Sequence, residues 1–162
     1  METGATETGA MSEQEMRERV IKLAFGGDES RLEEFCEVVR AAIPEGTSVV
    51  LRGSAITGKR WDDGAPFDAD GPGTSDLDLT LVGVEVLGLY ILDGFYLPGV
   101  HTKPLSDKDP DIAPALTPLR DRLVAMANRP VNIQSTRDFV MYIREHWMGQ
   151  PFLTLIGSVG ES

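Results

Sequence analysis

The most constraining feature of the sequence is SDLDLTL (residues 75–81), in which polar and apolar residues alternate. Side chains of a β-strand point alternately to its two faces, so this pattern predicts a strand with its leucines toward the core. Asp76, Asp78 and Thr80 then share the other face, with the two carboxylates about 6.6 Å apart along the backbone. Two explanations stay open: a solvated strand face, or two carboxylates that converge on one or two divalent cations.

Aspartate is a poor strand former, so two aspartates in an otherwise strong strand are a local conflict of the kind found at functional sites. A second feature, Gly53-Ser54, ends the apolar strand that we expect in TSVVLRGS, residues 47–54. Glycine lets a phosphate approach the backbone closely, and the serine hydroxyl and the amides of the next turn can donate to phosphate oxygens. A phosphate cradle at the end of one strand and a metal pair on the next make one consistent site.

Hydrophobic periodicity predicts the order helix, helix, strand, long loop, strand, and then helix, strand, helix. The expected fold class is α/β (α+β), a small mixed sheet covered by helices. The expected helices span 11–25, 29–43 (capped by Asp28 or Ser30), 86–92, 112–127 and 137–147, and the expected strands lie in 47–54, 75–83, 94–99 and 130–134. Residues 148–157 are expected to extend the last helical layer. We expect residues 1–11 to be a disordered tail and 12–162 a single domain.

Composition excludes several classes of protein. With 162 residues, 41% of them hydrophobic, and a net charge of −11, the chain favours a soluble globular protein and disfavours long nucleic acid as a partner. The sequence shows no bilayer-length apolar run and no signal peptide, and its single cysteine, Cys36, cannot form an internal disulfide. We therefore expect a cytoplasmic protein without a membrane partner. Cys36 and His146 are interpreted as packing residues on helix faces.

Residues 51–83 resemble the signature of the DNA polymerase beta-like nucleotidyltransferase superfamily, in particular its small bacterial members, the minimal nucleotidyltransferases. The segments that carry the resemblance are VVLRGS, residues 49–54, and SDLDL, residues 75–79. The resemblance implies that Asp76 and Asp78 are catalytic and bind Mg²⁺ or Mn²⁺. It also implies that the β- and γ-phosphates of a nucleoside triphosphate such as ATP are held by Gly53 and Ser54, with Ser75 as a further nucleotide-binding residue.

The superfamily usually has a third acidic residue on a later strand, and here the chain departs from the pattern. The strand with suitable spacing is 130–134, where Asn132 or Gln134 stands in place of an acid. Asn132 can bind a metal through its amide oxygen, but it has no charge and cannot act as a base. Other acids that could substitute for it by rough position are Asp68, Asp70 and Asp138.

A second departure is the length of the spacer, since 21 residues separate Ser54 from Asp76. This insert is either a tolerated surface loop or a lid over the site. In the lid interpretation, Lys59 or Arg60 binds a phosphate, and an aromatic ring, from Trp61 or Phe67, stacks on a base.

The resemblance implies transfer of a nucleoside monophosphate from a nucleoside triphosphate to an acceptor, with release of pyrophosphate. The acceptor expected is a hydroxyl of a small molecule or of a protein. Two other classes of function stay open. One is a catalytically degenerate module that binds a nucleotide or a partner, which Asn132 favours. The other is a structural or interaction protein whose aspartates are merely solvated.

Overall fold

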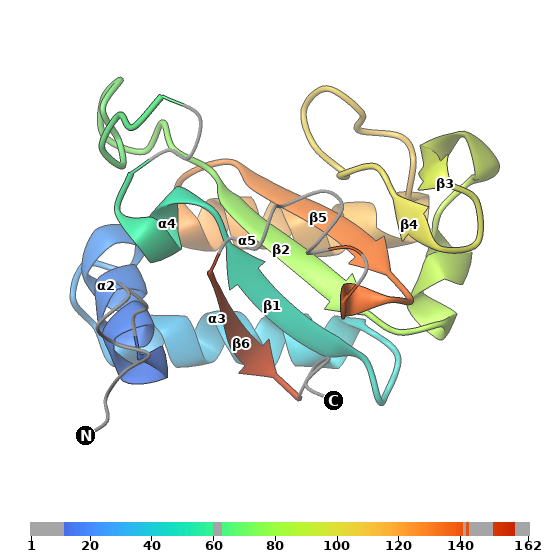
Figure 1. Cartoon of the computed structure of the whole chain (residues 1–162), viewed down its shortest axis with the longest axis horizontal. Helices are drawn as coiled ribbons and strands as arrows, with labels where there is room; N and C mark the ends of the chain where they lie inside the picture. Colours follow the sequence, from blue (N-terminus) through green and yellow to red (C-terminus); the bar gives the residue numbers. More distant parts are fainter. Residues whose placement is uncertain (1–11, 60–62, 141, 143–150, 158–162) are drawn as a thin grey trace.

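The computed structural model describes residues 12–59, 63–140, 142 and 151–157. Within these residues the chain forms a six-stranded sheet in the order β3-β4-β5-β2-β1-β6 (Figure 1). β2 and β5 run parallel, whereas the other neighbouring strands are antiparallel, so the predicted mixed sheet and α+β class are confirmed. The strands are β1 Ser48–Arg52, β2 Leu77–Val82, β3 Phe95–Leu97, β4 His101–Thr102, β5 Val131–Thr136 and β6 Phe152–Ile156. The predicted tail, 1–11, lies outside the described residues.

Helices cover one face of this sheet. Figure 1 shows α3 (Glu29–Ala42) and α5 (Thr117–Ala127) behind the strands, and the two helices contact each other. α2 (Glu13–Ala24) contacts the short α4 (Ser54–Thr57), which directly follows β1. Short 3₁₀ helices are η1 Glu85–Leu89, η2 Leu92–Gly94 and η3 Pro114–Leu116. None of the helices in the described ranges combines the length and the apolar character that crossing a bilayer requires.

The first two helices begin where their side chains can satisfy the free amides of a first turn. Ser12 Oγ accepts a hydrogen bond from the Glu15 amide at 3.1 Å, and Glu15 Oε1 accepts one from the Ser12 amide at 2.9 Å. This reciprocal capping box starts α2. Of the two caps considered for α3, the structure uses Asp28, whose Oδ1 accepts from the Ser30 amide at 3.0 Å.

Two predicted helices are corrected. The helix expected over 112–127 begins only at Thr117, because η3 occupies 114–116 and Pro118 is confined to the first helical turn by its missing N–H. The helix expected over 86–92 is instead the 3₁₀ helix η1, followed by extended backbone that leads into η2. Gly88 and the β-branched residues of this stretch disfavour a regular α-helix.

The C-terminal stretch is a third correction. Residues 148–157 were expected to extend a helical layer, but Phe152–Ile156 form β6, the edge strand that pairs antiparallel with β1. The alternating sequence FLTLI suits a strand that is only partly covered, with Leu153 buried. Of the helix expected over 137–147, residues 139, 140 and 142 are helical, and residues 141 and 143–147, including His146, lie outside the described residues.

The main core lies between the sheet and the helices. Leu77, Leu79 and Leu81 are wholly buried, which confirms the face predicted from the alternation in β2. They belong to one cluster with β1 and with the apolar faces of the helices, including Val49, Leu51, Leu32, Phe35, Leu119 and Leu123. Burial of these residues fixes which face of β2 looks inward.

The opposite face of the sheet is also covered at its centre. Thr80 is wholly buried, and a second apolar cluster joins Val50 of β1 to Phe139 and Tyr142. A solvated strand face, one of the two explanations for the alternation, is therefore wrong at Thr80. The polar face of β2 instead lies in a buried and largely hydrogen-bonded environment.

We expect Leu79→Ala to lower the free energy of unfolding by about 2–5 kcal/mol, because it leaves a cavity at the centre of the sheet. Leu92 is 74% exposed and provides the matched control. Leu92→Ala should change the free energy of unfolding by less than about 0.5 kcal/mol. Urea denaturation of both variants measures the difference, and equal losses would contradict this placement of the core.

Candidate functional site

The candidate site forms where three strands meet at one end of β2. In the antiparallel pair β1–β2, Arg52 lies opposite Asp78. In the parallel pair β2–β5, Asp78 lies opposite Asn132. The end of β1 and the beginning of β5 therefore flank the beginning of β2. This register brings the Gly53-Ser54 turn and Asn132 to the aspartates from opposite sides.

The two carboxylates converge on one atom. Asp76 lies just before β2 and Asp78 within it, and both accept hydrogen bonds from Asn132 Nδ2, at 2.7 Å to Asp76 Oδ2 and 2.9 Å to Asp78 Oδ1. Both side chains thus point to the same side, as the alternation predicts. The side chain of Asp78 is only 19% exposed. Asn132 stands at the strand position at which the superfamily resemblance expects the third acid.

Gly53 is required by the close approach of the chain to Asp78. Its φ of +98° lies in a region that side chains disfavour, and a Cβ placed there would come within 2.8 Å of Asp78 Oδ2. The carbonyl of Gly53 accepts hydrogen bonds from the amides of Ile56 (3.0 Å) and Thr57 (3.3 Å), which starts α4 with Ser54 as its first residue. The Gly-Ser pair therefore turns the chain directly beside the carboxylates.

Arg52 is the part of the site that the sequence interpretation missed. It is 2% exposed, and its Nε donates to Thr80 Oγ1 at 3.1 Å while Nη2 donates to Gln134 Oε1 at 2.9 Å. Nη1 lies 3.7 Å from Asp78 Oδ2. Gln134 Oε1 also accepts from the Tyr142 hydroxyl. The sequence did carry a signal for this role. Side chains of β1 alternate between the two faces of the sheet, and this alternation places Arg52 on the same face as Asp78, at a buried position.

The electrostatics of Asp78 follow from this burial. Loss of solvation raises the pKa of its carboxyl above the ordinary value, and the negative charge of Asp76 acts in the same direction. The guanidinium of Arg52 and the hydrogen bond from Asn132 oppose the rise. The site thus places a mostly buried carboxylate beside a second acidic group.

The insert between Ser54 and Asp76 is anchored to the domain by Arg129. The guanidinium of Arg129 binds both oxygens of Asp68, at 2.8 and 3.1 Å, and lies 4.6 Å from the centre of the Phe67 ring. Asp68 adopts a positive φ of 61°, and its carboxylate also accepts from the amides of Gly73 (3.2 Å) and Ser75 (2.9 Å). Arg129 lowers the pKa of Asp68 to about 2. Phe67 and Asp68 thus belong to an anchor of the insert.

The other predicted nucleotide-binding residues lie in or beside this insert. Ser75 Oγ accepts from the Asp68 amide at 2.7 Å, and the Ser75 carbonyl accepts from Arg129 at 2.8 Å, so Ser75 contributes to the anchor. Lys59 forms a β-bridge with Pro66 at the base of the insert. Arg60 and Trp61 lie outside the described residues.

Of the acids considered as substitutes for the third carboxylate, Asp68 and Asp138 are held elsewhere. Asp68 is bound to Arg129, and Asp70 follows it in the exposed insert. Asp138 follows the far end of β5, six residues beyond Asn132, a distance of about 20 Å at the rise of a strand. Within the described residues no group of three or more His, Cys, Asp or Glu side chains is placed to hold a metal.

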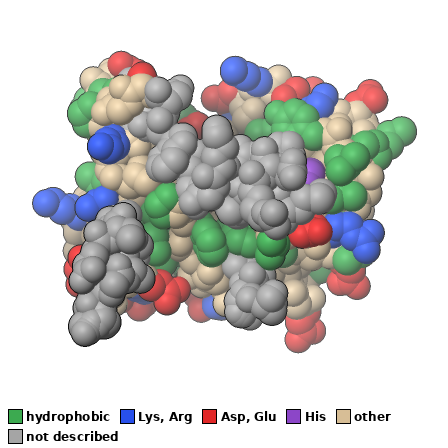
Figure 2. All heavy atoms as spheres, viewed as in Figure 1, with side chains coloured by type: hydrophobic (Ala, Val, Ile, Leu, Met, Phe, Trp, Pro, Cys, Tyr) green, Lys and Arg blue, Asp and Glu red, His purple; other side chains and the backbone are tan. Residues whose placement is uncertain are grey.

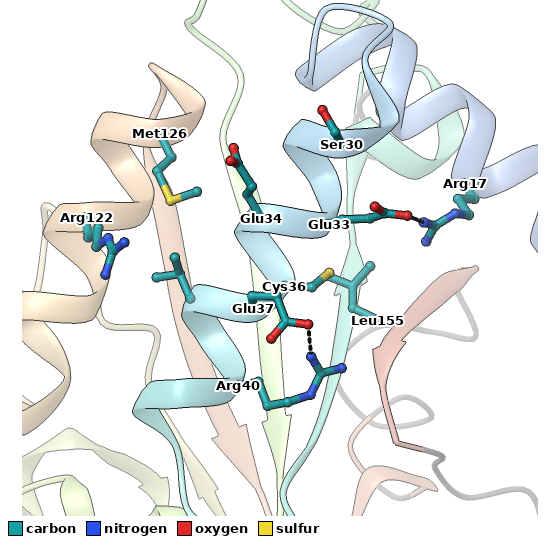
Figure 3. Close-up of a pocket in the computed structure, with 11 residues that line it drawn as sticks. Arg17, Ser30, Glu33, Glu34, Cys36, Glu37, Arg40, Arg122, Met126 and Leu155 are labelled. Atoms are coloured by element: carbon teal, nitrogen blue, oxygen red, sulfur yellow. Dashed lines mark hydrogen bonds and ion pairs between the residues drawn. The ribbon is translucent and has the colours of Figure 1, made fainter.

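A separate groove of about 820 Å³ lies on the helical side of the sheet, between α3, α5 and β6 (Figure 3). Cys36 lines it, and burial raises the pKa of this thiol. Its charged walls include the ion pairs Arg40–Glu37 at 2.7 Å and Arg17–Glu33 at 3.9 Å. The groove lies across the sheet from the carboxylates, so the two features are independent.

His101 and the surface charges complete the description. His101 is buried in β4, and its Nδ1 lies 2.7 Å from Thr136 Oγ1, far from the aspartates at the other end of β5. Figure 2 shows the described Lys and Arg side chains scattered over the visible face. Comparison with known proteins gave no match among family models, curated proteins or solved structures.

We expect Asp68→Asn to destabilise the protein at neutral pH, because it removes the carboxylate that Arg129 binds. The folded pKa of Asp68, about 2, lies below its ordinary value of 3.8, so this stabilisation is present above pH 4 and is lost as the pH falls toward 2. Urea denaturation of both proteins between pH 2 and pH 7 should show a difference that shrinks on acidification. A difference independent of pH would contradict the ionic anchor.

Proposed function

We propose that this chain is a metal-dependent nucleotidyltransferase that moves a nucleoside monophosphate from a nucleoside triphosphate to a hydroxyl group. The observation that carries the proposal is the convergence of Asp76 and Asp78 on one atom beside the Gly53 turn. A carboxylate pair next to a strand-ending glycine is an arrangement that can bind a metal-bound triphosphate, since the carboxylates can hold the ion and the glycine can admit the phosphates. The resemblance of residues 51–83 to the superfamily signature supports the same function.

The chemistry of the donor set fits a hard divalent cation. Asp76 and Asp78 offer carboxylate oxygens, and Mg²⁺ is commonly held by one or two carboxylates together with substrate phosphates. The NH₂ group of Asn132, whose hydrogens carry partial positive charge, donates hydrogen bonds to both carboxylates. If this amide rotates by half a turn, it presents its oxygen instead. The oxygen would then be a third ligand, which is neutral, beside the two carboxylates.

In the proposed reaction Asp76 and Asp78 hold Mg²⁺ or Mn²⁺, which when bound neutralises charge on the α-phosphate and on the leaving group. The backbone at Gly53 and the hydroxyl of Ser54 contact the β- and γ-phosphates. The acceptor hydroxyl would lose its proton to solvent water as its oxygen forms a bond to the α-phosphorus, the bond from the α-phosphorus to the α–β bridging oxygen would break, and pyrophosphate would leave. Lys59, Arg60 and Ser75, at the edges of the insert, are proposed as further contacts to the nucleotide.

The proposed acceptor is a small-molecule or protein hydroxyl. The net charge of −11 repels the phosphates of a long nucleic acid, whereas a single nucleotide is screened by its own metal ion. The charge therefore supports a small or proteinaceous acceptor over DNA or RNA.

We expect Asp76→Ala and Asp78→Ala each to reduce pyrophosphate release from a nucleoside triphosphate with Mg²⁺ or Mn²⁺ by roughly 100-fold or more, because the metal contributes several kcal/mol to the transition state. Asp121→Ala, at an exposed position on α5, is the matched control and should keep full activity. Pyrophosphate release is measured for each of the four nucleotides. Equal activity in all variants would rule this site out.

A second candidate is a module that binds a nucleotide but does not turn it over. The observation that favours it is Asn132, which stands where a general base is expected and cannot accept the acceptor's proton. Calorimetry with a triphosphate and Mn²⁺ separates the two functions. Binding that Asp76→Ala abolishes, without pyrophosphate release from the wild-type protein, is the result expected of the degenerate module. Absence of any metal-dependent nucleotide binding would contradict both.

A further inference from the structure

The buried guanidinium of Arg52 is held in one orientation beside the carboxylate pair. Hydrogen bonds to Thr80 and Gln134 engage Nε and Nη2, and Gln134 is itself held by Tyr142 and by a hydrogen bond from its Nε2 to the Thr102 carbonyl at 2.7 Å. The side chain is 2% exposed, so it cannot turn into solvent. Nη1 therefore stays on the Asp78 side of the site.

Arg52 and Asn132 face different oxygens of Asp78. Asp78 Oδ2 faces Arg52 Nη1 at 3.7 Å. Asp78 Oδ1 and Asp76 Oδ2 face the amide of Asn132. These two converging oxygens, one from each aspartate, are the pair that would bind a cation.

The fixed charges of the site limit how much positive charge it can take. Asp76 and Asp78 contribute two negative charges and Arg52 one positive charge, while Asn132 is neutral. Among the residues that the structure describes, these four groups leave one net negative charge, which suits a single divalent ion that completes its shell with phosphate oxygens. A second ion close to Asp78 Oδ2 would lie against the guanidinium, and two positive groups that close together repel each other.

We propose that Arg52 is a positioning residue that restricts the carboxylate pair to one divalent cation, in place of the two ions of a paired-metal site. The inference rests on the proposed function, because it concerns the metal of that same site. Arg52 acts through Asp78: its fixed charge takes the place of the second ion and keeps Asp78 Oδ1 turned toward the first. Asn132 belongs to the same arrangement, since a third carboxylate would restore the charge that a second ion needs.

The test counts Mn²⁺ ions on the full-length protein, alone and with a nucleoside triphosphate analogue whose α–β bridge is a methylene group. Calorimetry gives the number of ions, and electron paramagnetic resonance distinguishes an isolated Mn²⁺ from two ions about 3.5–4 Å apart, which couple magnetically. We expect one protein-bound ion with an isolated signal. Two coupled ions in the wild-type protein would overturn the role of Arg52 and leave the proposed nucleotidyltransferase standing. Absence of Mn²⁺ binding in both conditions would overturn the proposed function and this inference with it.

Two variants test the charge argument directly. Asn132→Asp should bind a second, coupled Mn²⁺, whereas Asn128→Asp, the same substitution at the end of α5, should bind one. Arg52→Gln should bind a second Mn²⁺ that couples to the first, because the repelling charge is gone, and Arg122→Gln on the exposed side of α5 should bind one ion like the wild-type protein. A single ion in folded Asn132→Asp would contradict the inference. Because Arg52→Gln removes a buried hydrogen-bonded group, thermal unfolding of this variant is measured first. If the variant does not fold, the comparison of Asn132→Asp with Asn128→Asp decides the test.

Discussion

The candidate site depends on the register of β2 between its two neighbours. The wholly buried leucines of this strand face the helices, and a slip of one residue would turn them to the other side of the sheet. Because they cannot slip without exposing the core, Asp78 is held opposite Arg52 of β1 and Asn132 of β5. Burial of the leucines on one face of the sheet thus fixes which polar side chains lie next to one another on the other face.

The polar face of the sheet is itself largely an interior, and this changes what its charged groups can do. Thr80, Gln134 and the hydroxyl of Tyr142 form a hydrogen-bonded network around the guanidinium of Arg52. A buried charge is costly unless it is paired and hydrogen-bonded, and the network with Asp78 meets that need. The same burial raises the pKa of Asp78, whereas the guanidinium of Arg52 opposes that rise.

The insert between Ser54 and Asp76 is anchored in its second half, whereas Arg60 and Trp61 of its first half lie outside the described residues. The bidentate pair between Arg129 and Asp68 ties its second half to the start of β5, and the amides of Gly73 and Ser75 complete the tie. Such pairing was not visible in the sequence, because Asp68 was one of several aspartates in a polar stretch and Arg129 follows a distant helix. The sequence allows the insert to be either a tolerated surface loop or a lid. The described residues show that the part around Asp68 is an anchored loop.

Much of the framework could be predicted from local patterns. The alternation of SDLDLTL determined that its leucines are buried and that Asp76 and Asp78 point to one side, because a period of two leaves a strand no other arrangement. The apolar run ending in Gly53-Ser54 likewise determined a strand followed by a turn. The tertiary structure alone decided what meets the carboxylates: Arg52, Asn132 and the glycine that admits the backbone to Asp78. These neighbours come from separate strands, and which strands pair, and in which register, is decided by burial of the whole sheet rather than by any local period.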